Sequence, residues 1–192
     1  MKNIILCSLS LFIFSNLIAQ NKFSLTLKDG SVINGLVRIS ENKIVFRKSL
    51  DSEEEFYDYK TIKKMTVPEK NYVYKIVEGS GGTNSIKLVE VVISGKISLY
   101  KGTQQIYYNP STTNGILGGG STSSYSIYYI SNKDSDVVTN LRIGNIYSSR
   151  FKQIAKKHFK SCPDLLEKIN KKYFGRYSIT SVIMYFNENC GN

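Results

Sequence analysis

The chain of 192 residues carries 26 lysine and arginine residues against 15 aspartate and glutamate residues, which gives a formal net charge of +11. That length suits one ordinary domain or two small modules, and the excess of positive charge favours anionic partners. One histidine and three cysteines do not supply the closely spaced ligands of a typical zinc site. We therefore expect no metal and no cofactor.

The N-terminal residues have the layout of a secretory signal peptide. Lys2 precedes an apolar run from Ile4 to Phe14, and small or polar residues lead to Ala19. A positive start, a short apolar middle and a small residue at the cut are typical of export signals, and the run is shorter than the ~20 residues that span a bilayer. The alternative is a retained N-terminal anchor. We expect residues 1–19 to be a signal peptide whose cleavage also removes Cys7.

Two cysteines, Cys162 and Cys190, remain after this cleavage. An even pair in an exported chain indicates a disulfide, because oxidising compartments preserve such bonds. Pro163 suits the first position of a helix, Gly175 suits a helix end, and Ser178 can cap a further helix. Two helices joined by a short loop run antiparallel, so the cysteines would meet, and their bridge would contribute about 3–4 kcal/mol. A metal site or a redox pair fits less well, since no C-x2-C spacing occurs.

Residues 20–70 show the patterns of an antiparallel β module. Apolar and polar residues alternate from Phe23 to Leu27, which is the period of a half-buried strand. The Asp-Gly pair at 29–30 predicts a tight hairpin turn, and Gly35 predicts a bend or bulge in the second strand. The acidic segment LDSEEEFYD predicts a solvated loop or edge before a further strand. We expect a small barrel-like module here.

Residues 71–146 predict an antiparallel β meander with a flexible loop at 109–124. The strand-like segments YVYKIVE, SIKLVEVVIS, KISLYKG and QQIYY are separated by turn-like GSGGTN and SGK. The triple glycine of the loop is not followed by Gly-Lys-Ser/Thr, so a phosphate-binding P-loop is not indicated. Tyrosines in this region suggest cross-strand packing or, as the minority interpretation, a sugar-binding platform: Tyr107, Tyr108, Tyr125, Tyr128 and Tyr129.

Residues 147–192 predict a helical unit that begins with a helix capped by Ser149. From Tyr147 onward the chain has nine basic and three acidic residues, a net charge of +6. Cleavage after Ala19 would leave 25 basic and 15 acidic residues, a net charge of +10, so these helices hold more than half of the excess. The candidate anion-binding residues are Lys152, Lys156, Lys157, Lys160, Lys171 and Lys172. The alternative is a solvated surface that keeps the protein in solution.

No catalytic centre is indicated by the sequence. His158 lies within a basic amphipathic segment, at the margin of its apolar face, and we expect it to be half-buried and hydrogen-bonded. The acidic residues Glu53, Glu54 and Glu55 are consecutive and point in different directions, without the alternating ligands of a calcium loop. A nucleophile, a base and an orienting group are needed for catalysis, and no motif supplies them. We expect the protein not to be an enzyme.

The positions Leu27, Asp29, Gly30 and Gly35 resemble the first half of an Sm-like or SH3-like small barrel, in which a bent second strand follows an Asp-Gly hairpin. The resemblance covers residues 23–67 and implies a small barrel. Sm-like proteins bind RNA through an aspartate-methionine-asparagine segment and a later arginine-glycine or lysine-histidine loop. This chain has ISENKI in the first place and no counterpart of the second, so the resemblance does not extend to the RNA site.

The wider pattern is similar to that of uncharacterised exported envelope proteins of Bacteroidota. A KDG…G hairpin near the mature start, the segment VEVVISGKISLY, and cysteines placed like 162 and 190 near a YFN end carry this resemblance. It implies an exported protein and brings no known activity.

The sequence as a whole predicts an α+β fold: a small barrel-like antiparallel β module and a β meander, closed by a C-terminal helical unit. The predicted function is a non-enzymatic structural or protein-interaction role in the cell envelope, in the periplasm, at the outer-membrane periphery or in the secreted fraction. One alternative is peripheral binding to an anionic membrane surface or glycan through the C-terminal helices. A weaker alternative is a hydrolase. The expected partner is an envelope protein or an anionic membrane surface, not a nucleic acid.

Overall fold

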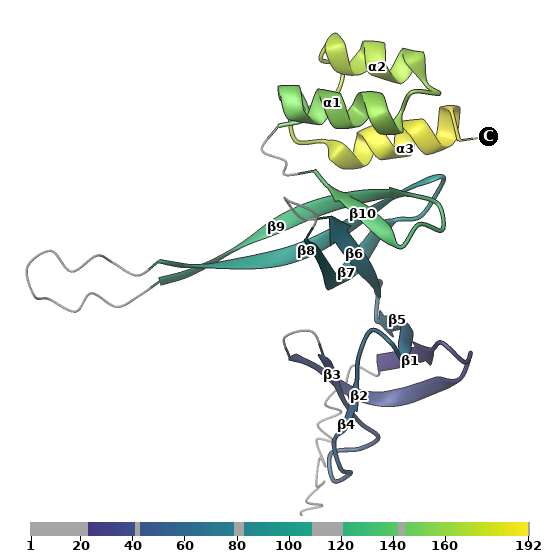
Figure 1. Ribbon diagram of the computed structural model, residues 1–192, viewed down its shortest axis with the longest axis vertical. Coiled ribbons are helices and arrows are strands. Elements are labelled where there is room, and N and C mark those ends of the chain that lie inside the picture. The colour runs from purple at the N-terminus through teal and green to yellow at the C-terminus, as the bar shows by residue number, and fades with distance from the viewer. Residues whose placement is uncertain (1–22, 41–42, 79–82, 109–120, 142–144, 192) are drawn as a thin grey trace, which may run out of the picture.

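A computed structural model of the protein describes residues 23–40, 43–78, 83–108, 121–141 and 145–191 (Figure 1). The expected signal peptide at 1–19 lies outside the described residues. Within them, ten strands join in one hydrogen-bonded sheet, and three helices follow. The α+β fold class with a small barrel and a C-terminal helical unit is confirmed, but among the described strands the barrel closes within β6–β10 (residues 70–140) and not within the 20–70 module where the sequence placed it.

The first five strands pair in the order β5-β1-β2-β3-β4. The Asp-Gly turn that was expected joins β1 to β2, and Gly30 adopts a φ of +92° there. The acidic segment contributes a short edge strand, β4, which pairs only with β3 among the described residues. The bounds are β1 (Phe23–Leu27), β2 (Val32–Ser40), β3 (Lys43–Arg47), β4 (Glu55–Tyr57) and β5 (Ile62–Val67).

Gly35 is the point at which β2 changes partners. Residues up to Gly35 pair with β1, and residues from Leu36 onward pair with β3. A Cβ at position 35 would lie 2.3 Å from the carbonyl oxygen of Arg47 and 2.7 Å from the Phe46 ring. The strand can therefore approach β3 this closely only because the residue has no side chain. The sequence predicted a bend or bulge at this glycine, and the structure places a change of partner strand there.

The next five strands form a closed barrel. Each pairs antiparallel with the next, and β10 returns to pair in parallel with β6 through Val137–Ile76 and Val138–Val77. Among the described residues, the buried apolar cluster of the barrel interior consists of Val77, Val89, Tyr100, Tyr129 and Val138. The ring therefore closes within the segment that the sequence predicted as a meander. The bounds are β6 (Lys70–Glu78), β7 (Asn84–Ile93), β8 (Ile97–Tyr108), β9 (Ser121–Asn132) and β10 (Val137–Asn140).

The flexible loop expected at 109–124 is shorter than predicted. Residues 121–124 belong to β9 and pair with β8, with Ser121 opposite Tyr108 and Ser124 opposite Gln105. Residues 109–120 lie outside the described residues. Pairing with β8 thus extends β9 into a segment of serine and threonine that the sequence assigned to the loop.

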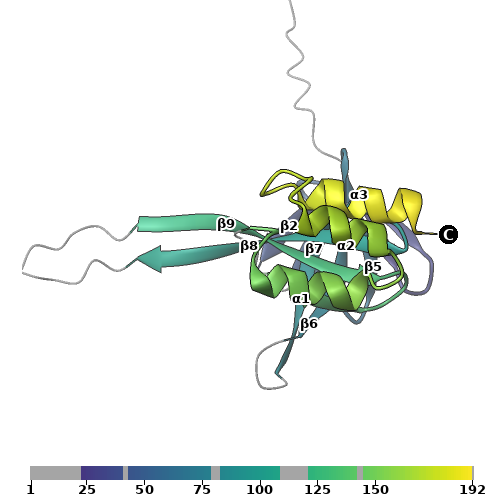
Figure 2. The same cartoon turned by 90° about the horizontal axis from the view of Figure 1, so that it is seen from above.

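Three helices cover one side of the barrel (Figures 1 and 2): α1 (Ser149–His158), α2 (Pro163–Asn170) and α3 (Ile179–Asn189). Their apolar faces join Ile97, Leu99 and Ile130 of β8 and β9 in the largest buried cluster of the described residues. The non-polar faces of the three amphipathic helices are thus buried against the sheet.

The helix ends differ in detail from the prediction. The capping residue of α1 is Ser148, not Ser149, and its hydroxyl accepts a hydrogen bond from the Phe151 amide. The second helix ends at Asn170, before Gly175, and Lys172 adopts a left-handed φ of +58° just beyond it. Ser178 occupies the cap position of α3, although its side chain makes no capping hydrogen bond.

Candidate functional site

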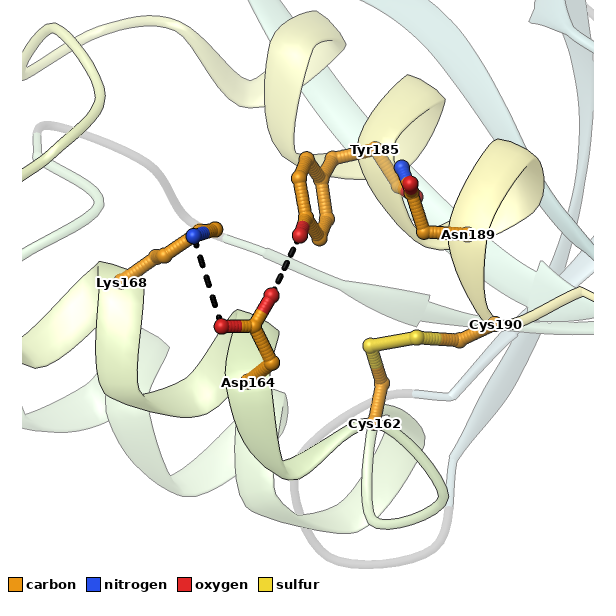
Figure 3. Close-up of a disulfide and its surroundings, with 6 residues drawn as sticks. All are labelled: Cys162, Asp164, Lys168, Tyr185, Asn189 and Cys190. Carbon is orange, nitrogen blue, oxygen red and sulfur yellow. Dashed lines mark hydrogen bonds and ion pairs between the residues drawn. A yellow bond between two sulfur atoms is a disulfide. The ribbon is translucent and has the colours of Figure 1, made fainter.

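The predicted disulfide joins Cys162 and Cys190, whose Cα atoms lie 5.6 Å apart (Figure 3). Cys162 precedes α2 and Cys190 follows α3, so the bridge ties together the two ends that antiparallel packing brings side by side. Cys162 is buried in the cluster beneath the helices. The covalent bond therefore closes the helical unit on itself by tying the start of α2 to the end of α3.

A polar contact beside the disulfide holds the same two helices together. The Tyr185 hydroxyl of α3 donates a hydrogen bond to Asp164 of α2, and the Lys168 ammonium lies 3.3 Å from the same carboxylate (Figure 3). The hydrogen bond from Tyr185, followed by the contact with Lys168, lowers the pKa of Asp164 below its ordinary value. The Lys168 ammonium also lies over the Tyr173 and Tyr185 rings. Because this group is on the surface, it orients the helices more than it stabilises them.

The six lysines expected to bind anions do not form one group. Lys156, Lys157 and Lys160 are exposed near the end of α1, whereas Lys171 and Lys172 follow the far end of α2. Since α2 begins just after Lys160 and rises about 1.5 Å per residue, its eight residues separate the two sets by roughly 12 Å. The Lys171 ammonium is also paired with Glu167 at 2.5 Å. Lys152 is half-buried on α1.

His158 is half-buried and hydrogen-bonded, as the sequence predicted. Its Nε2 lies 3.3 Å from the hydroxyl oxygen of Thr139 on β10, so the ring links α1 to the barrel. Burial lowers the pKa of His158 below its ordinary value of 6.5, the positive charge of Lys157 lowers it further, and Glu78 partly opposes them. The histidine is therefore a packing residue that favours its neutral form.

This environment predicts that the protein loses stability as the pH falls below about 6.5. The unfolded chain takes up the proton on His158 at a higher pH than the folded chain does, so protonation favours unfolding in that window. His158→Gln, which cannot gain the charge, should show a flatter pH dependence. Urea unfolding at several pH values between about 7.5 and 5 measures this. If the free energy of unfolding depends on pH in the same way in the wild type and in His158→Gln, the expectation is contradicted.

The tyrosines of β8 and β9 do not form one cluster. Tyr128 packs against the helical unit, whereas the next residue, Tyr129, fills the barrel. Tyr125 is 43% exposed. The side chains of Tyr107 and Tyr108 lie outside the described part of the chain. Alternation along the strand thus sends adjacent tyrosines to opposite faces.

The β8–β9 pair extends well beyond the barrel as a two-stranded ribbon, seen from the side in Figure 1 and from above in Figure 2. All residue pairs from Ile97–Asn132 to Tyr108–Ser121 are in register. The pairing of β8 with β7 reaches only Lys101, and that of β9 with β10 reaches only Tyr129. Within the described residues, no other strand pairs with β8 from Gly102 or with β9 up to Ile127. We call residues 102–108 and 121–127 the ribbon.

The ribbon lies within an uncharged part of a highly charged chain. From Gly102 to Asn132, 31 consecutive residues contain no lysine, arginine, aspartate or glutamate, although 21% of the whole chain is charged. Charged residues, especially lysine, normally protect open strand edges from pairing with other chains. Ser123, Ser124 and Ser126 are exposed and uncharged. The absence of charged residues from 102 to 132 is evident in the sequence. It indicates an unprotected strand edge only because these strands project from the barrel.

The candidate carboxylates are engaged in structural contacts. Glu54 lies 2.9 Å from Arg47 and 3.5 Å from Arg38, and Glu55 accepts a hydrogen bond from the Tyr57 hydroxyl. That hydrogen bond raises the pKa of Tyr57 to about 12. Among the described residues there is no group of three or more His, Cys, Asp or Glu side chains that could hold a metal ion.

None of the helices that the structure describes is long and apolar enough to cross a membrane. No protein-family model, curated protein or solved structure matches the chain.

Proposed function

We propose that the protein is a non-enzymatic, exported protein of the cell envelope that binds an extended segment of another envelope polypeptide along the ribbon. The observation that carries this proposal is the projecting pair of strands with open, uncharged edges. An extended segment can add to such an edge through main-chain hydrogen bonds, while its alternate side chains give specificity.

The energetics of the ribbon favour such a partner. An isolated two-stranded hairpin is at best marginally stable in water, and the ribbon has no third strand among the described residues to support it. A partner strand would satisfy the open backbone groups of Gly102–Tyr108 or Ser121–Ile127. The exposed serines beside these edges add no charge that would repel it.

Export is supported by two separate features. The disulfide between Cys162 and Cys190 is typical of proteins in oxidising compartments, and residues 1–19 have the pattern of a cleaved signal. Together they favour the periplasm, the outer-membrane periphery or the secreted fraction. Two residues with catalytic potential make structural contacts: His158 lies against Thr139, and Glu54 pairs with Arg47.

A truncated variant tests the role of the ribbon. Gly102 and Ile127 lie opposite each other, so residues 103–126 can be replaced by Asn-Gly, which favours a two-residue hairpin turn. The barrel pairings through Lys101 and Tyr129 remain in place. We expect wild-type protein, cross-linked in its native envelope and isolated, to recover a polypeptide partner. The truncated protein should recover at least about tenfold less, since each 1.4 kcal/mol of lost binding is tenfold in affinity.

The matched control keeps the ribbon at full length. Tyr177→Ala changes an exposed residue of the helical unit and leaves the ribbon unaltered, so recovery of the partner should be unchanged. Thermal unfolding of all three proteins verifies that the barrel is intact. Equal recovery by wild-type and truncated protein, or no reproducible partner for the wild type, would contradict the proposal.

A further inference from the structure

A candidate site separate from the ribbon lies at one end of the barrel. A pocket of about 790 Å³ opens there, between the turn that joins β7 to β8 and the turn that joins β9 to β10. This volume is within the range of small-molecule sites. We call this pocket the barrel mouth. Its charged residues are Lys75, Lys96, Lys133 and Asp134.

Three separate segments bring the lysines of the barrel mouth together. Lys75 comes from β6, Lys96 from the β7–β8 turn and Lys133 from the β9–β10 turn. The two turns are joined by a backbone hydrogen bond of 2.8 Å, in which the Lys133 amide donates to the Lys96 carbonyl oxygen. Three lysines and one aspartate give the lining a net charge of +2. A concave site lined by an excess of positive charge attracts anionic ligands.

Lys75 is the most deeply placed of the three. It lies on the same inward face of β6 as Val73 and Val77, and its side chain is only 11% exposed. Its ammonium donates a hydrogen bond of 2.7 Å to the Ser135 carbonyl oxygen and lies 5.5 Å from the centre of the Tyr100 ring. The carboxylate of Asp136, 3.5 Å away, is 83% exposed and therefore a weak partner. The position of this charge is thus fixed before any ligand arrives.

Hydroxyl groups line the same pocket. Ser98 and Tyr100 line the barrel mouth and are buried. The buried Ser131 hydroxyl donates a hydrogen bond of 3.4 Å to the Tyr100 oxygen. Because the Tyr100 oxygen accepts this bond, its own proton can be donated to a ligand. The barrel mouth therefore combines positive charge with neutral donors.

The β7–β8 turn, which carries Lys96, is held in place by α3. The Asn187 side chain of α3 accepts a hydrogen bond of 3.0 Å from the Ile97 amide and donates one of 2.8 Å to the Ile97 carbonyl oxygen. A Cβ at Gly95 would lie 2.3 Å from this amide, so the close approach requires glycine. Gly191, next to disulfide-bonded Cys190, also lines the pocket. The turn is therefore anchored to a covalently closed unit, which preorganises it.

We propose that the barrel mouth binds a phosphate monoester group. Such a group carries a charge of about −1.5 to −2 near pH 7 and offers three acceptor oxygens, which matches the net lining charge and the lysine and hydroxyl donors. Lysine binds phosphate as a compact point charge. The phosphate could belong to a small organic molecule in solution or to a lipid headgroup, and these sources are distinguished by experiment.

Titration calorimetry with glycerol phosphate tests the free source, and co-sedimentation with phosphatidylcholine vesicles, with and without phosphatidic acid, tests the lipid source. The test variant is Lys96→Gln with Lys133→Gln. Its matched control, Lys48→Gln with Lys60→Gln, removes the same net charge from exposed positions outside the barrel mouth. We expect at least about a tenfold loss of affinity in the test variant and less than about twofold in the control, with weaker wild-type binding at higher salt.

Binding to either phosphate source that is lost only in the Lys96→Gln, Lys133→Gln variant supports the site and identifies the source. Amide chemical-shift changes on adding glycerol phosphate or phosphatidic acid in detergent micelles should centre on residues 94–100 and 131–135 of the wild-type protein. This second measurement does not depend on the variants folding. No binding of either source, an equal loss in both variants, or shift changes elsewhere would overturn the proposal. Truncating the ribbon removes no residue of the barrel mouth, so the two proposals fail or succeed separately.

Discussion

Phe159→Ala will lower the free energy of unfolding by about 3–5 kcal/mol, the range typical of large-to-small changes at buried aromatic residues. Phe159 has no exposed surface, follows α1 directly, and lies 5.2 Å from Phe186 of α3, centre to centre. It also belongs to the cluster that joins the helices to Leu99 and Ile130 of the barrel. The cavity left by its removal would therefore weaken helix–helix and helix–barrel packing together. Urea unfolding followed by circular dichroism measures the loss.

An exposed aromatic residue in the same helical unit provides the control. Tyr177 is 70% exposed, so Tyr177→Ala should change the free energy of unfolding by no more than about 0.5 kcal/mol. Similar small effects for both variants would mean that the helical unit does not pack on the barrel as described. A large effect for Phe159→Ala alone supports the packing.

Removing the disulfide will destabilise the protein by about 3–4 kcal/mol according to the loop-entropy relation. The bridge closes a loop with a sequence separation of 28 residues, and its loss increases the freedom of the unfolded chain. Cys162→Ala with Cys190→Ala is the suitable change, because alanine leaves no polar group at the buried position 162. For a chain of this length the melting temperature should fall by roughly 6–16 °C. Differential scanning calorimetry measures it.

Reducing agent gives the internal control for this prediction. Reductant should destabilise the wild-type protein to a similar extent and leave the double alanine variant unchanged. An equal effect of reductant on both proteins would mean that the agent acts elsewhere. A double variant as stable as the wild type would show that the helices hold their arrangement without the bond.

The helical unit was the part of the fold most readily predicted from sequence, because its signals are local. Pro163 starts α2, the apolar residues recur at helical spacing, and the two cysteines mark ends that antiparallel helices bring together. Errors were confined to the ends, as at Ser148. Neighbouring residues compete for capping positions, and sequence alone does not decide between two adjacent serines.

Closure of the barrel could not be predicted in the same way. The parallel contact of Val137 and Val138 with Ile76 and Val77 joins segments about sixty residues apart, and no local pattern encodes such a pairing. The Asp-Gly turn, by contrast, depends on two adjacent residues and was predicted correctly.

The contrast between local sequence signals and long-range strand pairing also explains which candidate binding residues the sequence identified. Lysines on the predicted amphipathic helices were taken as the anion-binding candidates, but they are divided between the end of α1, as for Lys156, and the end of α2, as for Lys171. The lysines of the barrel mouth were missed because Lys96 and Lys133 are in turns that become neighbours only through strand pairing. Lys75 alone left a readable signal, since it interrupts the apolar alternation between Val73 and Val77.

The binding role of the ribbon is tested most directly by site-specific photo-cross-linking in intact cells that produce the protein naturally. A photoreactive residue is placed at Ser126, on the ribbon, and in a second strain at Tyr177, an exposed position of the helical unit. We expect Ser126 to give a discrete adduct with one polypeptide and Tyr177 to give none. No polypeptide adduct at Ser126, or the same adduct from both positions, would contradict the proposed function.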